Sequence, residues 1–184
     1  RGMADVALFE IGPQYADDTA AGQALVATVL RAGAAVSRHW QGPPRPVDAF
    51  DAKADALSLM EGLDAPAGNV QVTADAPSWY HPGRSGTLRL GPAVLGWFGE
   101  LHPAVAEALD AAAPLAVCEV FLDRLPLPKS KGPARPLLRL SPLMPVTRDF
   151  AFVVGTDVPA DKVLRAVRGA DKALIADAAV FDVY

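Results

Sequence analysis

The chain has very little cysteine, with Cys118 the single one among 184 residues. A lone cysteine cannot form a disulfide within the chain, and its apolar surroundings predict a buried thiol in a reducing compartment. No apolar run is long enough for a membrane-spanning helix. A strand-like run, without a small-residue cleavage site, follows Arg1–Asp5. We therefore expect no signal peptide, no membrane contact and a cytoplasmic location.

Several catalytic and cofactor motifs are also missing. The three histidines, His39, His81 and His102, lie far apart and Cys118 has no neighbouring cysteine, so we expect no metal site. The sequence contains no P-loop and no strand followed by Gly-x-Gly-x-x-Gly. A net charge of −4 argues against a protein that coats nucleic acid over its whole surface. These absences leave a domain with a large apolar core and no recognisable cofactor motif of its own.

Proline and positive charge concentrate in one stretch. The stretch runs from residue 124 to residue 148 and contains no acidic residue. Its six basic residues are Arg124, Lys129, Lys131, Arg135, Arg139 and Arg148. The same stretch holds six of the 17 prolines, which stiffen the chain and remove backbone donors. We predict a linker at 124–140 between domains at 1–123 and 141–184. Its charge has two open interpretations, solubility of an exposed linker and contact with RNA phosphates.

The first domain is predicted to be α+β, with antiparallel strands and a few helices. Asp51 is a candidate N-cap of a helix that runs to about Gly62, and His102-Pro103 begins a helix that runs to about Ala112. Apolar or alternating runs predict strands at 6–13 (ending at Gly-Pro), at 70–74, in two halves of 88–101 joined at Gly91-Pro92, and at 115–122. The run 24–30 fits a helix or a buried strand, because its periodicity does not separate the two.

The second domain is predicted to contain a strand at 149–154, a helix at 159–168 and a strand-like run at 174–184. Helical spacing turns Val163, Leu164 and Val167 inward. It also places Lys162, Arg165 and Arg168 on one exposed face. That face can contact RNA, but the flanking acids Asp161 and Asp171 favour an ordinary solvated surface.

Two neighbouring segments, 79–86 and 96–103, combine Trp, His and Arg with glycines. We interpret the first as a loop in which Gly83 and Gly86 permit positive φ, and in which Arg84 can offer donors to a carboxylate or phosphate. One interpretation is a docking or ligand loop. The other is a structural turn whose aromatic side chains cap the local core. Glu100 and Glu119 are a candidate carboxylate pair on neighbouring strands, although a strand glutamate more often faces solvent or pairs with an arginine such as Arg89.

A different class of function is a free-standing hydrolase or small-ligand-binding domain built on the Tyr80–Gly86 loop. It would use His81, Arg84, Ser85 and Glu100 in one pocket. The spacing of Gly83-Arg84-Ser85-Gly86 is not that of a nucleophile elbow. Hydrogen-bond contact between His81 and Ser85 would favour the hydrolase, and dispersal of the four side chains would favour docking.

A set of collinear segments resembles the bacterial phenylalanyl-tRNA synthetase β subunit over essentially the whole chain. One such segment would be weak, but several in register are specific. They are Phe9-Glu10-Ile11-Gly12, Asp48-Ala49-Phe50-Asp51-Ala52-Lys53, Tyr80-His81-Pro82-Gly83-Arg84-Ser85-Gly86, Gly99-Glu100-Leu101-His102-Pro103, Pro145-x-x-Arg148-Asp149-Phe150-Ala151-Phe152 and Phe181-Asp182-Val183-Tyr184.

The resemblance implies a C-terminal fragment with no catalytic residue. The first domain would be a class II synthetase-like sheet that docks the catalytic α subunit, and 141–184 would begin a ferredoxin-like anticodon-binding domain. Residues 96–103 lack the arginine that a class II ATP site needs, so the fragment is expected to bind no cofactor, while the whole complex uses ATP and magnesium to attach phenylalanine to tRNA-Phe. The implied docking or structural residues are Tyr80, His81, Gly83, Arg84, Gly86, Glu100 and His102. The implied tRNA contacts are Arg148, Lys162, Arg165 and Arg168.

The second domain is truncated relative to this family. A ferredoxin-like fold runs β-α-β-β-α-β, and only β-α-β is present here. Its first two strands are separated in the sheet by the third, which these residues lack. We expect the piece to be poorly ordered, packed on the first domain or completed by another molecule, and unpaired edges permit self-association.

Overall fold

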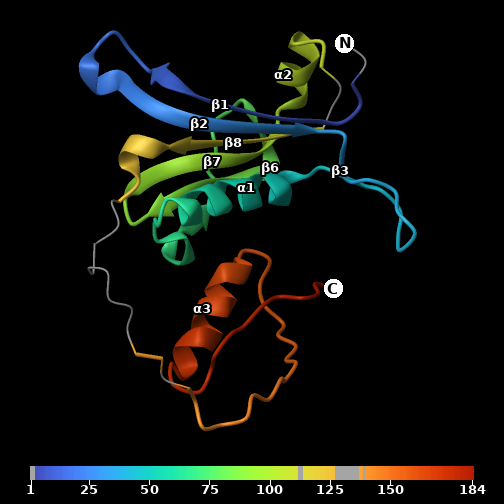
Figure 1. Cartoon of the computed structure of the whole chain (residues 1–184), viewed down its shortest axis with the longest axis vertical. Coiled ribbons are helices and arrows are strands. Elements are labelled where there is room, and N and C mark those ends of the chain that lie inside the picture. Colours follow the sequence, from blue (N-terminus) through green and yellow to red (C-terminus); the bar gives the residue numbers. More distant parts are fainter. Residues whose placement is uncertain (1–2, 112–113, 127–136, 139) are drawn as a thin grey trace. The chain divides into compact units, whose positions relative to one another are not determined.

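The computed structural model describes residues 3–111, 114–126, 137–138 and 140–184. The chain divides into two compact units, unit 1 at Arg1–Ser130 and unit 2 at Lys131–Tyr184 (Figure 1). Four of the linker's basic residues, Lys129, Lys131, Arg135 and Arg139, lie outside the described residues, so the prediction of an extended linker stays a prediction. No helix in the described part is long and apolar enough to cross a membrane.

Unit 1 is built on a six-stranded antiparallel sheet, which confirms the α+β prediction (Figure 1). From one edge to the other its strands are β1 (Val6–Tyr15), β2 (Gln23–Ala32), β8 (Leu115–Phe121), β7 (Ala93–Leu101), β6 (Tyr80–Leu90) and β5 (Gln71–Thr73). The turn at Gly91-Pro92 joins β6 to β7 as predicted, and Gly91 takes a φ of 58° there. The remaining elements of unit 1 are η1 (Ala20–Gly22), β3 (Ala34–Val36), β4 (Arg45–Pro46), α1 (Ala49–Gly62), η2 (Ala67–Asn69), α2 (Pro103–Ala108) and η3 (Leu122–Arg124).

The ambiguous run at 24–30 is a strand. It lies within β2, which is paired to β1 on one side and β8 on the other. Such an interior strand reads as a continuous apolar run, which explains why its sequence resembles a helix as much as a strand. The predicted end of the first strand at Gly12-Pro13 is wrong, since β1 continues to Tyr15. Pro13 is tolerated because β1 is an edge strand, where a missing donor leaves no neighbour unpaired.

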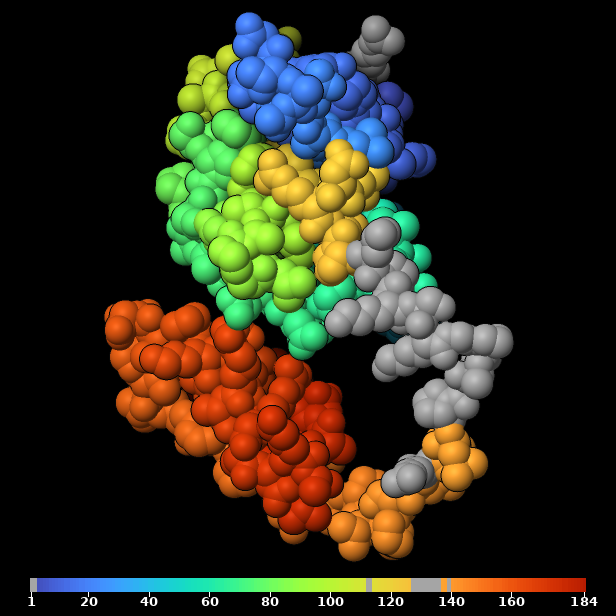
Figure 2. All heavy atoms as spheres, turned by 90° about the vertical axis from the view of Figure 1, so that its left-hand side faces the viewer, coloured from blue at the N-terminus to red at the C-terminus, as the bar shows by residue number. Residues whose placement is uncertain are grey.

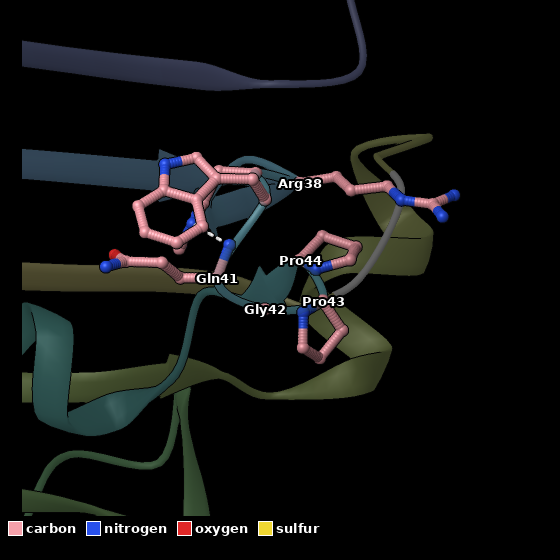
Figure 3. A pocket seen from close by; sticks show the side chains of 7 residues that line it. Arg38, Gln41, Gly42, Pro43 and Pro44 are labelled. Carbon is pink, nitrogen blue, oxygen red and sulfur yellow. Dashed lines mark hydrogen bonds between the residues drawn. The ribbon is translucent and has the colours of Figure 1, made fainter.

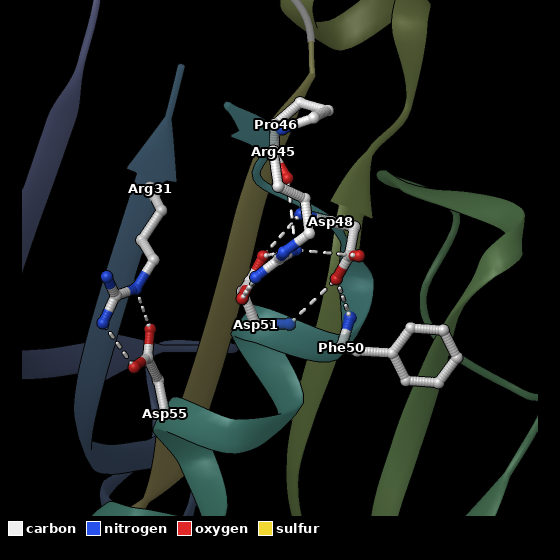
Figure 4. A network of polar contacts seen from close by, with 7 residues as sticks. All are labelled: Arg31, Arg45, Pro46, Asp48, Phe50, Asp51 and Asp55. Carbon is white, nitrogen blue, oxygen red and sulfur yellow. Dashed lines mark hydrogen bonds and ion pairs between the residues drawn. The ribbon is translucent and has the colours of Figure 1, made fainter. Parts of the chain in front are cut away.

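Helix α1 begins earlier than predicted, and its N-cap is Asp48 rather than Asp51. The Asp48 carboxylate accepts hydrogen bonds from the N–H of Phe50 (2.8 Å) and Asp51 (3.1 Å) (Figure 4). Asp51 is the third helical residue, and its carboxylate accepts the N–H of Asp48 at 2.9 Å, which completes a capping box. The buried side chains Ala52, Ala56 and Met60 recur every four residues. They form one stripe that packs against Leu88, Phe98, Cys118 and Val120 of the sheet.

Helix α2 has the predicted start and an earlier end. His102 is its N-cap, with Nδ1 accepting the N–H of Ala104 at 3.2 Å, and Pro103 occupies the first helical position. The helix ends at Ala108, and Asp110 then takes a left-handed φ of 51°. The N–H of Ala111 bonds the carbonyl of Ala106 at 3.0 Å, a C-terminal motif that closes the helix before the predicted Ala112.

Unit 2 contains the predicted helix but not the predicted strands. α3 (Ala160–Ala170) has Val163, Leu164 and Val167 half-buried, as expected. Residues 149–154 and 174–184 are described but form no strand, so the β-α-β prediction is wrong for its two strands. A run forms a strand only where a neighbouring strand offers its backbone, and neither run has such a neighbour among the described residues.

Candidate functional site

The segment at 80–86 is not a loop but the first part of β6. Tyr80 pairs with Leu101, and the next pair along the strand is Ser85 with Gly99, so residues 81–84 form a wide bulge. Neither Gly83 nor Gly86 takes a positive φ, which corrects the prediction made for both. The positive-φ glycine of the motif is Gly99, on the facing strand.

Hydrogen bonds between side chains and the main chain hold the bulge together. Ser85 Oγ donates to the carbonyl oxygen of His81 at 2.6 Å, and the N–H of Gly83 donates to His81 Nδ1 at 3.1 Å. Arg84 Nε lies 2.7 Å from Glu100 Oε2. Each polar group of the proposed hydrolytic set is thus engaged with the bulge itself, and the His81 imidazole does not meet the Ser85 hydroxyl. The hydrolase interpretation is not favoured.

Tyr80 anchors the buried side of the motif, with only 1% of its surface exposed. Its hydroxyl donates to Glu119 Oε1 at 2.8 Å, and Trp79 Nε1 lies 3.3 Å from the same oxygen. Burial, followed by the negative charge of Glu119, raises the pKa of the Tyr80 phenol well above its usual range. The ring and hydroxyl of Tyr80 are therefore structural, and its side chain is not available to a partner.

An aromatic cluster extends from this anchor across the sheet. The ring centroids of Trp79 and Trp97 lie 5.7 Å apart and those of Trp97 and Phe121 4.8 Å apart, both edge to face. The guanidinium of Arg124 lies 3.9 Å from the centroid of Phe121. The cluster links the residue before β6 to the middle of β7 and the end of β8, on the sheet face opposite α1.

The two glutamates do not form a carboxylate pair. Glu119 lies opposite Trp97 in the ladder and Glu100 opposite Ala116, so they fall on opposite faces of the sheet. Glu100 is bound to Arg84 and Glu119 to Tyr80. Arg89 pairs with Asp75 instead of with either glutamate. No group of three or more His, Cys, Asp or Glu side chains that could hold a metal ion occurs among the described residues.

The basic residues of unit 2 are exposed and partly neutralised. Arg165 pairs with Asp161, and Arg168 lies 3.3 Å from Asp177 and 2.7 Å from the carbonyl oxygen of Ala178. Arg148 donates to the carbonyl of Thr147, and Lys162 is exposed on the same helix as the two paired arginines. This pattern agrees with the flanking acids noted in the sequence. A role of these four residues in binding tRNA stays a prediction.

The buried thiol of Cys118 offers a test of whether the core excludes water. Burial raises the pKa of its thiol to about 12, whereas an unfolded cysteine titrates near pH 8.5. Below the unfolded value both states are protonated and the stability is intact. Between the two values only the unfolded chain loses the proton, so the free energy of unfolding falls with rising pH, by up to about 1.4 kcal/mol per pH unit.

We expect Cys118→Ala to flatten this fall. Urea unfolding of both proteins at several pH values between about 8 and 11 measures the difference in slope, since every other group titrates alike in both chains. Parallel pH dependences for the two proteins would contradict the buried, protonated thiol.

Comparisons with known proteins agree with the resemblance. Residues 1–122 match a family model described as the phenylalanyl tRNA synthetase beta chain CLM domain. The chain belongs to this family. Residues 141–184 match a second model, the ferredoxin-fold anticodon binding domain.

Relatives named phenylalanine–tRNA ligase beta subunit align with the whole chain. Those of Paramagnetospirillum magneticum, Rhodospirillum rubrum and Bradyrhizobium diazoefficiens are 54%, 52% and 49% identical to it. The aligned parts are 23%, 23% and 24% of these relatives, so this member of the CLM family spans about a quarter of their length.

Sequence reasoning passed over one feature, the hairpin between β3 and β4. Trp40 at its tip is 90% exposed. A tryptophan three residues before two consecutive prolines, in an otherwise polar segment, was the available signal. The pairing of Tyr80 with Glu119 was also missed, because the two residues are far apart in the sequence and meet through the sheet register.

Proposed function

We propose that the chain is a non-catalytic part of the β subunit of a phenylalanine–tRNA ligase, an α/β complex that uses ATP and magnesium to attach phenylalanine to tRNA-Phe. Unit 1 would be a class II synthetase-like sheet that docks the α subunit, and unit 2 would contribute to tRNA binding. The names of the relatives and the two matched family models support this assignment. A cytoplasmic location and self-association through the unpaired runs 149–154 and 174–184 of unit 2 belong to the same proposal.

The observation that carries the docking role is an uncovered apolar strip at one edge of the sheet. Helix α1 packs mainly on β7, β8 and β2 and makes no contact of that extent with the outer strand β1. On the same face as α1, Phe9, Ile11 and Tyr15 of β1 are 78%, 57% and 64% exposed. Their neighbour Leu25 on β2 is 40% exposed. Figure 2 shows this N-terminal hairpin, in blue, at the surface of unit 1.

An exposed apolar edge strand of this length promotes aggregation unless something covers it. Contiguous apolar patches of this kind mark protein interfaces, whereas single exposed apolar side chains do not. A subunit that must associate permanently with a partner accounts for both the strip and the free edge of β1. The α subunit is the partner that the family assignment supplies.

The test replaces two apolar side chains of the strip with threonine, which keeps β1 a strand. We expect Phe9→Thr with Ile11→Thr to weaken binding of the purified α subunit about ten-fold or more, because large apolar side chains at interface centres carry most of the binding energy. Threonine preserves strand propensity. Titration calorimetry with the α subunit measures the change.

Leu8→Thr is the matched control. Leu8 is also on β1 and is 61% exposed, but it lies on the opposite face of the sheet. Equal weakening by the control and the double variant would assign the effect to the strand as a whole rather than to the strip. Undiminished binding by the double variant would remove the support for docking through this face.

A further inference from the structure

The hairpin that joins β3 to β4 projects from the sheet and carries the most exposed large apolar side chain of the described part of unit 1. Trp40 is 90% exposed. The hairpin pairs Ala34 with Pro46, and its tip closes through main-chain bonds between His39 and Gly42 of 3.2 and 3.4 Å. A single exposed apolar side chain does not mark a binding site by itself, but an indole on an ordered hairpin offers a large flat face on which a planar ligand can stack.

The base of the hairpin is firmly held. Val47 follows β4 directly, is 3% exposed in the core and bonds the carbonyl of Gly33 through its N–H at 2.9 Å. Arg45 Nη2 lies 2.6 Å from Asp51 Oδ1, and Arg45 Nη1 lies 3.2 Å from Asp48 Oδ2, so the hairpin is tied to the capping box of α1 (Figure 4). A ligand at the tip therefore meets a surface that is already ordered, which lowers the entropic cost of binding.

The tip is positively charged and polar. No acidic residue occurs from Ala34 to Val47, although the whole chain carries a net charge of −4. Arg45 is neutralised by its two aspartates, whereas Arg38 is exposed and makes no ion pair within the part of the chain that the structure describes. Figure 3 shows a shallow depression lined by residues 38–44, with the side chains of Arg38 and Gln41 pointing away from each other.

We propose that this hairpin binds single-stranded RNA, with an unpaired base stacked on Trp40 and a phosphate bound by Arg38. Aromatic side chains stack on unpaired bases of any sequence, and a nearby arginine supplies the charge that a phosphate requires. A tryptophan at the centre of a protein interface is surrounded by groups that exclude water. The chain neighbours of Trp40 are instead His39 and Gln41, both exposed, which suits the polar edges of a base. The inference rests on the proposed function only for the source of the RNA, an unpaired segment of the tRNA.

The experiment measures binding of a fluorescent single-stranded oligoribonucleotide about eight nucleotides long, within the usual site size of single-strand-binding folds. We expect Trp40→Ala to weaken binding about ten-fold or more. We expect Arg38→Gln to reduce the slope of log K against log salt concentration by about 0.7, the value of one phosphate on a single strand. Stacking should also quench indole fluorescence in the parent chain, and the quenching should disappear in Trp40→Ala.

Trp79→Phe is the matched control, because Trp79 is 40% exposed but belongs to the aromatic cluster, and it should leave affinity unchanged. Unchanged RNA affinity in Trp40→Ala would overturn the proposal, as would a preference for duplex RNA of the same sequence. Loss of α-subunit binding by Trp40→Ala at unchanged RNA affinity would assign the hairpin to a protein partner and also overturn it.

A second variant separates this proposal from the role of unit 2. The combination Lys162→Gln, Arg165→Gln and Arg168→Gln removes the basic face of α3 and leaves the hairpin intact. Weaker tRNA binding by that variant, together with unchanged binding of the single strand by Trp40→Ala, would support the proposed tRNA role and overturn the hairpin site. Weaker binding of the single strand by Trp40→Ala would support the hairpin site, whether or not the α3 variant binds tRNA more weakly and whether or not the chain binds the α subunit.

Discussion

A chain carrying Gly99→Ala is expected to lose about 3 kcal/mol or more of its free energy of unfolding. Gly99 has a φ of 149°, which side-chain-bearing residues rarely adopt. A Cβ at this position would lie 2.4 Å from Ser85 Cβ and 2.5 Å from the carbonyl oxygen of Arg84. Both neighbours belong to the bulged strand facing it, so relief requires β6 and β7 to separate. Urea unfolding followed by circular dichroism measures the loss.

Gly83→Ala is the control from the same motif. A Cβ on Gly83 would meet only ring atoms of His81, at 3.8 and 3.9 Å, and the residue does not need a positive φ. We expect a change within about 0.5 kcal/mol, as for most exposed substitutions. Similar stabilities of the two variants would contradict the tight contact between β6 and β7.

The second large effect is expected at Tyr80. Tyr80→Ala should cost about 3–5 kcal/mol, since it removes a fully buried aromatic ring. Tyr80→Phe keeps the ring and removes only the hydroxyl that binds Glu119, so its cost should be about 1–3 kcal/mol. Arg84→Ala should cost no more than about 1 kcal/mol, because the Arg84 side chain is 53% exposed.

Thermal and urea unfolding of the three variants check this order. An Arg84→Ala cost equal to that of Tyr80→Ala would show that the ion pair, rather than the ring, holds the bulge. The ranking also has a practical use. Lost α-subunit binding in Tyr80→Ala would report unfolding rather than docking, so variants of the motif that test docking should change Arg84 and leave Tyr80 in place.

The sequence predicted the sheet and its turns well where local signals are strong. The turn at Gly91-Pro92 and the start of α2 at His102-Pro103 rest on residues whose backbone preferences act locally, and both are confirmed. The interior strand β2 was left open because burial on both faces removes the alternation by which strands are recognised. The start of α1 was misplaced by three residues because Asp48 and Asp51 are both good caps, and only the reciprocal bonds distinguish them.

The roles of the site residues were harder to predict because they depend on contacts between strands that are far apart in the sequence. His81, Arg84 and Ser85 are residue types that active sites use, yet a three-dimensional bulge engages all three locally. Gly99 is required by the close approach of a neighbouring strand, which the sequence alone does not reveal. The two missing strands of unit 2 show the same dependence, since a strand sequence forms a strand only where a partner offers its backbone.

The burial of Cys118 also makes the chain convenient for chemical labelling. It is the single cysteine of the sequence and has no exposed surface, so the native thiol should not react with maleimide reagents at neutral pH. A cysteine introduced at an exposed position such as Gly83 would then be the one reactive thiol of an otherwise unaltered chain. Fluorophores or spin labels can thus be placed on the bulge, the β1 strip or the hairpin tip one at a time, without first removing a native residue from the core.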